Sequence, residues 1–165
     1  MVDADRAALL QRRRLLQLRL DRQRACARFR GIAPLLCERG MRFSKSPPAA
    51  TAPFVSRFAT LPGRDERVDW PAVDGARVQS RSDAGQCASL LAGALERCGA
   101  AADDRLLLVF HPDEAALVIG AADLCAAWPH LHPLLWDTLW IVPRGPGRWV
   151  AEVSLIDNDL GWLPA

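Results

Sequence analysis

The sequence predicts an α+β protein: an antiparallel sheet of two hairpins with helices packed on one face, plus an N-terminal basic helical segment. Three patterns lead to this fold class. Residues 106–110 form a continuous apolar run, residues 148–155 alternate between two faces, and residues 87–98 place apolar side chains at helical spacing. Helices and hairpins that alternate along a chain commonly share one core, with the helices on one side of the sheet.

The N-terminal residues 5–30 contain no proline or glycine and are rich in helix formers, so we expect a helix there. Its leucines follow two nearly opposite stripes, one through Leu16 and the other through Leu15, with arginines in the seams between them. Two apolar stripes require packing on two sides, which favours a bundle or a homodimer over a membrane surface. Residues 31–40 predict a second, short helix.

Composition divides the chain into three parts. We expect a basic helical segment at 1–42, a Pro-rich linker at 43–74 and an α+β body at 75–165, together making one compact domain. The linker is predicted from its repeated prolines, which break any long helix or strand. The Trp70-Pro71 pair is expected to begin the compact part.

The body begins with the best-defined helix, over residues 83–98. Asp83 is a good N-cap, Gln86 completes a capping box and Gly99 is a good C-terminal stop. A hairpin should follow, with strands at 106–110 and 115–119 and the turn His111-Pro112-Asp113-Glu114 between them. We then expect a short helix at 120–128, closed by Pro129.

The second hairpin is predicted from strands at 138–142 and 148–155 around the Pro/Gly-rich turn 143–147. The later strand should place Trp149, Ala151 and Val153 on its buried side and Glu152 on its solvent side. Trp140 and Trp149 are expected to pack against each other across this hairpin.

Charge is segregated along the chain. Residues 1–45 hold 12 Lys and Arg against 4 Asp and Glu, whereas residues 101–165 hold 3 against 9. No apolar run approaches the roughly 20 residues of a membrane span, and the first residues do not have the order of a secretory signal. Five cysteines, without a Cys-x-x-Cys pair, indicate reduced thiols and a cytoplasmic location.

A cysteine nucleophile is one enzymatic alternative. Cys87 falls in the first turn of the predicted helix, where the helix dipole lowers a thiol pKa. The segment GQCASLLAGALERCG resembles the nucleophile helix of transglutaminase-like proteins, and RWVAEVSLIDNDLGWLP resembles their later strand. That strand opens with a catalytic histidine in the family, but Arg148 or Trp149 stands at this position here. The resemblance therefore implies a degenerate enzyme without its general base.

Other chemistries have less support in the sequence. His130 and His132 with Cys125 would offer metal ligands, but the usual zinc spacing is missing, so we predict no metal and no cofactor. Asp103 and Asp104 are interpreted as solvated loop residues rather than an acid/base pair. The Arg-rich N-terminal helix could neutralise phosphates, which makes a nucleic-acid-associated protein an alternative.

A different resemblance covers residues 75–160. The runs LLLVFHPDEAALVIGAADL and DTLWIVPRGPGRWVAEVSL are similar in rhythm to small immunity proteins of bacterial contact-dependent growth inhibition and related polymorphic toxin systems. This resemblance implies a non-enzymatic protein, with no catalytic residue, that neutralises a cognate toxin domain such as a basic nuclease through an acidic surface. The acidic candidates for partner binding are Asp113, Glu114, Asp137, Glu152, Asp157 and Asp159.

Overall fold

The computed structural model describes residues 11–13, 15–16, 31–64, 67–80, 84–112, 114–135, 138–154 and 159–164. Most of the basic helix predicted at 5–30 lies outside these residues. The elements in chain order are β1 (Phe43–Ser46), η1 (Pro48–Ala50), α2 (Ala52–Phe58), β2 (Gly63–Arg64), β3 (Arg67–Val68), η2 (Trp70–Ala72), β4 (Arg77–Ser80), α3 (Ala84–Arg97), β5 (Arg105–Val109), β6 (Ala116–Gly120), α4 (Ala121–Leu131), η3 (His132–Leu134), β7 (Leu139–Pro143), β8 (Val150–Ser154) and β9 (Asp159–Leu163). Residues 31–38 are also helical.

The α+β class is confirmed, but the sheet is larger than two hairpins. Seven strands from the described part of the chain form one sheet in the order β1-β6-β5-β7-β8-β9-β4, and every neighbouring pair is antiparallel. The pairs β5–β6 and β7–β8 lie where the sequence places its hairpins. The additional strands β1, β4 and β9 extend the sheet on both sides, so that β1 and β4 form its edges.

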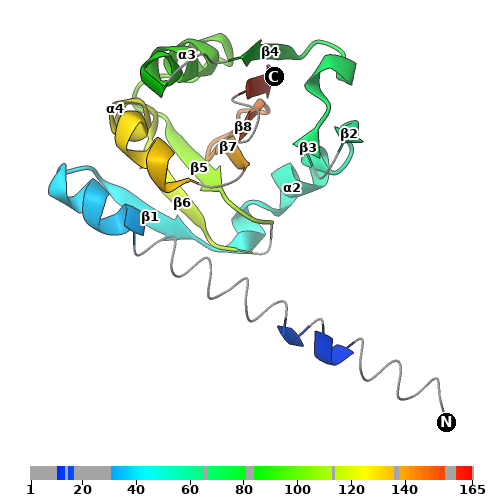
Figure 1. Cartoon of the computed structure of the whole chain (residues 1–165), viewed down its shortest axis with the longest axis horizontal. Helices are drawn as coiled ribbons and strands as arrows, with labels where there is room; N and C mark the ends of the chain where they lie inside the picture. Colours follow the sequence, from blue (N-terminus) through cyan, green and yellow to red (C-terminus); the bar gives the residue numbers. More distant parts are fainter. Residues whose placement is uncertain are drawn as a thin grey trace.

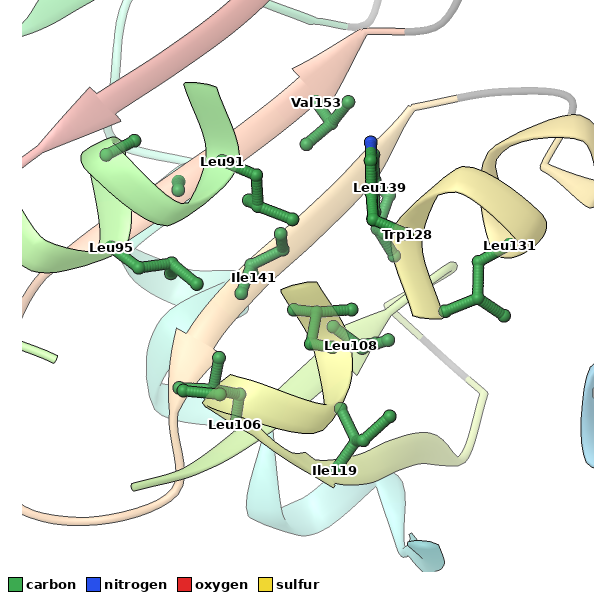
Figure 2. Packing of buried hydrophobic residues seen from close by; sticks show 14 of the residues in the cluster. Leu91, Leu95, Leu106, Leu108, Ile119, Trp128, Leu131, Leu139, Ile141 and Val153 are labelled. Carbon is green, nitrogen blue, oxygen red and sulfur yellow. The ribbon is translucent and has the colours of Figure 1, made fainter. Parts of the chain in front are cut away.

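The first face of the sheet is covered by α3 and α4, which lie side by side on it (Figure 1). Leu91 and Leu95 of α3 and Trp128 of α4 point toward Ile141 and Leu139 of β7, as Figure 2 shows. Ile32 and Leu36 of the helical residues 31–38 belong to the same buried cluster. The helical periodicity read from residues 87–98 therefore corresponds to a true core face.

The second face is also covered, which the sequence does not predict. Phe58 of α2 and Trp70 of η2 are buried against side chains of the central strands: Leu107, Val109, Ala116, Val118, Val142 and Val150. In Figure 1, α2 and the small β2–β3 pair lie on the opposite side of the sheet from α3 and α4. Residues 43–74, whose composition predicts a linker, thus contribute edge strand β1 and the cover of a second core.

Two other expectations differ from the structure. Helix α4 continues through Pro129 to Leu131, because Trp128 and Leu131 are buried and hold its last turn in the core. Trp140 and Trp149 do not pack against each other. Trp149 belongs to the cluster of the first face, whereas Trp140 packs with the cluster of the second face.

Glycines end the helical residues 31–38 and α3 in the same way. Gly40 and Gly99 adopt φ values of 66° and 82°. In each case the glycine N–H bonds the carbonyl three residues back, and the next N–H bonds the carbonyl five residues back. This is the Schellman arrangement, and it confirms Gly99 as the stop of the predicted helix.

Alanine substitutions at Gly99, which terminates α3, and at Gly93, which lies inside it, should have opposite effects on stability. Gly99→Ala should lower the free energy of unfolding by about 1 kcal/mol, because an L side chain is strained at positive φ. Gly93→Ala, inside α3 with open space around its Cβ position, should raise it by about 0.5–1 kcal/mol. Urea denaturation of both variants checks this prediction, and two changes of the same sign would contradict it.

Candidate functional site

The candidate site lies on the second face of the sheet and is organised by a buried carboxylate. Glu152 sits on β8, directly opposite Trp140 of β7 and Gly161 of β9. Its side chain is only 2% exposed. The sequence alternation correctly puts Glu152 on the face opposite Trp149 and Ala151. That face is covered by Phe58 of α2 and Trp70 of η2 and is not open to solvent at Glu152.

Both oxygens of this carboxylate accept an indole N–H. Trp140 Nε1 donates to Oε2 at 2.8 Å, and Trp70 Nε1 donates to Oε1 at 3.1 Å. Burial raises the pKa of Glu152, and it outweighs the opposing effects of the two indole hydrogen bonds, a backbone hydrogen bond involving Val68 and the charge of Arg67. A carboxylate whose two oxygens are occupied in this way is an anchor for the surrounding side chains.

Gly161 explains how Trp70 reaches this carboxylate. A Cβ atom built on Gly161 would overlap Cγ, Cδ1 and Nε1 of the Trp70 ring. The ring therefore lies directly over the β9 backbone, and its N–H meets Glu152 on the neighbouring strand. A glycine inside a strand often marks such a close approach.

Arg67 completes the polar centre from the β3 side. Its Nη1 donates to Ser154 Oγ at 3.1 Å, and its charge acts on Glu152. Ser154 lies two residues beyond Glu152 on the same face of β8 and is buried. The guanidinium thus lies against the sheet instead of extending into solvent.

A hollow of about 300 Å³ adjoins this polar centre. We call it the Trp140 cleft, and it is lined by Val55, Phe58, Ala59, Leu61, Gly63, Arg67, Val68, Pro112 and Trp140. The rings of Phe58 and Trp140 stack with their centroids 4.3 Å apart and an angle of 11° between their planes. The cleft therefore has a rigid aromatic wall, an otherwise largely apolar lining and one guanidinium.

A second hollow, of about 580 Å³, lies between residues 98–105 and the turn 143–149. Asp103, Asp104 and Arg144 are exposed at it, and Asp104 Oδ2 accepts the Ala101 N–H at 2.9 Å. Burial raises the pKa of the Cys98 thiol in its wall to about 12. Cys98 is therefore a neutral thiol near pH 7 and not a ready nucleophile.

The six acidic residues predicted for partner binding have different placements. Glu152 is buried, and Glu114, in the turn after β5, is 9% exposed, so neither belongs to an exposed acidic surface. Asp159 is partly exposed at the start of β9. Asp113, Asp137 and Asp157 lie outside the described residues. Pro112, in the turn that carries Glu114, lines the Trp140 cleft together with Val55 and Phe58 of α2.

The residues of the alternative chemistries are not assembled into a site in the described structure. Cys87 lies in the first turn of α3, but its side chain is outside the described part. At the position that holds a histidine in transglutaminase-like proteins, Arg148 is exposed and Trp149 is buried. Among the described residues, no three His, Cys, Asp or Glu side chains come close enough to hold a metal ion.

Comparison of the chain with protein-family models, curated proteins and solved structures found no match. Within the described residues, no helix has the length and apolar character needed to cross a membrane. The Trp140 cleft and its polar centre were missed by sequence reasoning. Two features of the sequence indicate this polar centre. They are a glycine between Leu160 and Trp162, and a lone glutamate in a strand of otherwise small or apolar residues.

The close packing at Gly161 predicts a large effect from one methyl group. Gly161→Ala should displace Trp70 and lower the free energy of unfolding by about 2–3 kcal/mol. Gly145→Ala is the control, because open space surrounds this exposed turn residue, and it should change stability by less than about 0.5 kcal/mol. Thermal and urea unfolding measure both variants; equal effects would show that Trp70 does not lie over Gly161.

The buried carboxylate predicts a pH dependence of known sign. The folded-state pKa of Glu152 is raised above its ordinary value of 4.5. Between pH 4.5 and that folded-state pKa, the folded state therefore holds more of this proton than the unfolded state does. This contribution to stability is present below pH 4.5 and is lost as the pH rises through the folded-state pKa.

Glu152→Gln should remove this part of the pH dependence, since an amide does not titrate there. It should also lower stability by about 1–3 kcal/mol, because one indole N–H loses its acceptor. Glu96→Gln, on the exposed side of α3, should leave the pH dependence unchanged. Urea unfolding at steps between pH 4.5 and 8 gives the comparison, and parallel curves for the wild type and Glu152→Gln would refute the assignment.

Proposed function

We propose that this chain is a non-enzymatic protein-binding protein: an immunity protein that neutralises a cognate toxin domain in the cytoplasm. The resemblance behind this proposal is one of element order, with a strand, a turn, a second strand and a helix, followed by a Trp-bearing strand pair. The elements β5, β6, α4, β7 and β8 follow one another in that order, and β5–β6 and β7–β8 are paired antiparallel. This agreement supports the proposal at the level of architecture.

The observation that carries the proposal is the Trp140 cleft. Its wall is aromatic and already fixed, its lining is largely apolar, and the nearest carboxylate, Glu152, has both oxygens occupied by indole N–H groups. Such a cleft can bind an apolar group but presents no proton acceptor or nucleophile to it. Pockets of this kind are the default binding sites of proteins.

The acidic surface of the proposal now rests on a smaller set of described residues. Asp103 and Asp104 are exposed in the loop before β5, and Asp159 is partly exposed. Opposite charge on a basic partner would accelerate encounter and help select it. Asp103 and Asp104 replace the buried Glu114 and Glu152 as the residues expected to steer the partner.

A role for the N-terminal helix in pairing two copies of the chain is a further part of the proposal. Leu15 and Leu16 are 61% and 54% exposed, although the two leucine stripes to which they belong require burial. A homodimer through this helix would cover them. Arg12 and Arg13 are exposed beside them, and this keeps the nucleic-acid alternative open for the same segment.

Co-expression tests the proposed function. A protein captured by the tagged full chain and identified by mass spectrometry is expressed alone, where we expect it to arrest growth; co-expression of this chain should restore colony counts at least tenfold. The double variant Asp103→Lys, Asp104→Lys should slow association about tenfold at low salt. A captured partner that leaves growth unaffected, or growth arrest that this chain does not relieve, would contradict the function.

A further inference from the structure

We infer that the Trp140 cleft receives an uncharged aromatic side chain of the protein partner. This inference rests on the proposed protein-binding function and specifies which chemical group of the partner is bound. It is independent of the exposed acidic residues, which lie elsewhere in the chain and act on the encounter. The cleft would hold the partner after the charges have brought it close.

The size of the cleft limits its occupant. Cavities that hold drug-sized ligands begin at about 300 Å³, and the Trp140 cleft has a volume of about 300 Å³. A volume at the lower end of this range has room for one large side chain. Aromatic anchors buried in such pockets are typical of the residues that dominate protein interfaces.

The wall of the cleft is fixed before binding. Trp140 is held at its N–H by Glu152 at 2.8 Å and at its ring by the stack with Phe58 at 4.3 Å. Its N–H is thus already used, so Trp140 offers ring surface to an occupant and not a hydrogen bond. A wall that needs no ordering on binding favours affinity.

The charge of the cleft selects against charged occupants. Among the described residues that line it, Arg67 is the one that carries a charge, and it donates a hydrogen bond to Ser154 Oγ. A partner lysine or arginine would be repelled by this guanidinium. A partner carboxylate would have to compete for a guanidinium that already donates to Ser154 Oγ and interacts with Glu152.

An aromatic ring is favoured over an aliphatic side chain by the same wall. Phe58 and Trp140 present aromatic surface, and a guanidinium stacks well on an aromatic face. Arg67, Phe58 and Trp140 all line the same cleft, so a ring bound there has both aromatic surface and a guanidinium beside it. Phenylalanine, tyrosine and tryptophan are therefore the partner residues expected to occupy the cleft.

Side-chain analogues test the inference on the full chain. We expect indole and 4-methylphenol to shift one indole N–H resonance, that of Trp140, in NMR titrations with a dissociation constant on the order of 1 mM. The cationic probe n-butylamine should bind at least tenfold more weakly. Ala59→Trp fills the cleft from the residue that follows α2 and should abolish the shifts. Ser56→Trp, on an exposed residue of α2 that does not line the cleft, should preserve them.

The captured partner separates this inference from the proposed function. Ala59→Trp should weaken the partner complex at least tenfold relative to Ser56→Trp, with both variants folded by circular dichroism. Equal capture of the partner by both variants would overturn the inference while the protein-binding function stands. Absence of any analogue binding, or analogue binding that Ala59→Trp leaves intact, would also overturn it.

Discussion

The packing on the second face of the sheet depends on the hydrogen bonds between Glu152 and the indole groups of Trp70 and Trp140. A carboxylate at this depth is unfavourable unless its oxygens are occupied, and each of them accepts one indole N–H. Trp140 belongs to the sheet, but Trp70 comes from residues far away in the chain. The same pair of hydrogen bonds that satisfies the carboxylate therefore attaches η2, which carries Trp70, to the sheet.

Once Trp70 is fastened there, the sheet has a core on each face. Successive residues of β8 illustrate the consequence, because Ala151 and Val153 are buried with α3 and α4 while Val150 is buried with Phe58 and Trp70. All five residues of this strand are buried. The strand therefore resembles an interior strand of a sheet covered on both faces, and not a strand with one face exposed to solvent.

The parts of the fold that local patterns predict are those that local interactions build. Helix α3 ends at Arg97, with Gly99 as its expected stop. The pairs β5–β6 and β7–β8 fall within a few residues of their predicted positions. The role of residues 43–74 in the core is not predicted from the sequence. Their prolines indicate a linker, and their short apolar pieces pack against residues that are distant in the sequence. Phe58 stacks on Trp140, and Trp70 donates a hydrogen bond to Glu152 and lies over Gly161. These contacts leave no periodic pattern in the sequence, and their local signals are Gly161 within a strand and the lone Glu152.

The error over Glu152 has the same origin and bears on function. A glutamate in an alternating strand indicates a solvent-facing position, and the resemblance to immunity proteins places Glu152 among the residues of an acidic surface. Its burial instead produces a raised pKa beside a cleft, a combination that often marks an acid or base in catalysis.

Geometry decides between catalysis and support at this position. A catalytic carboxylate must reach the proton that it transfers, whereas both oxygens of Glu152 already face indole N–H groups and its side chain is 2% exposed. Any group in the cleft would meet the ring of Trp140 first, since this ring both lines the cleft and binds the carboxylate. Glu152 therefore acts on an occupant only through Trp140, by holding the aromatic wall in the position that makes the cleft a binding site.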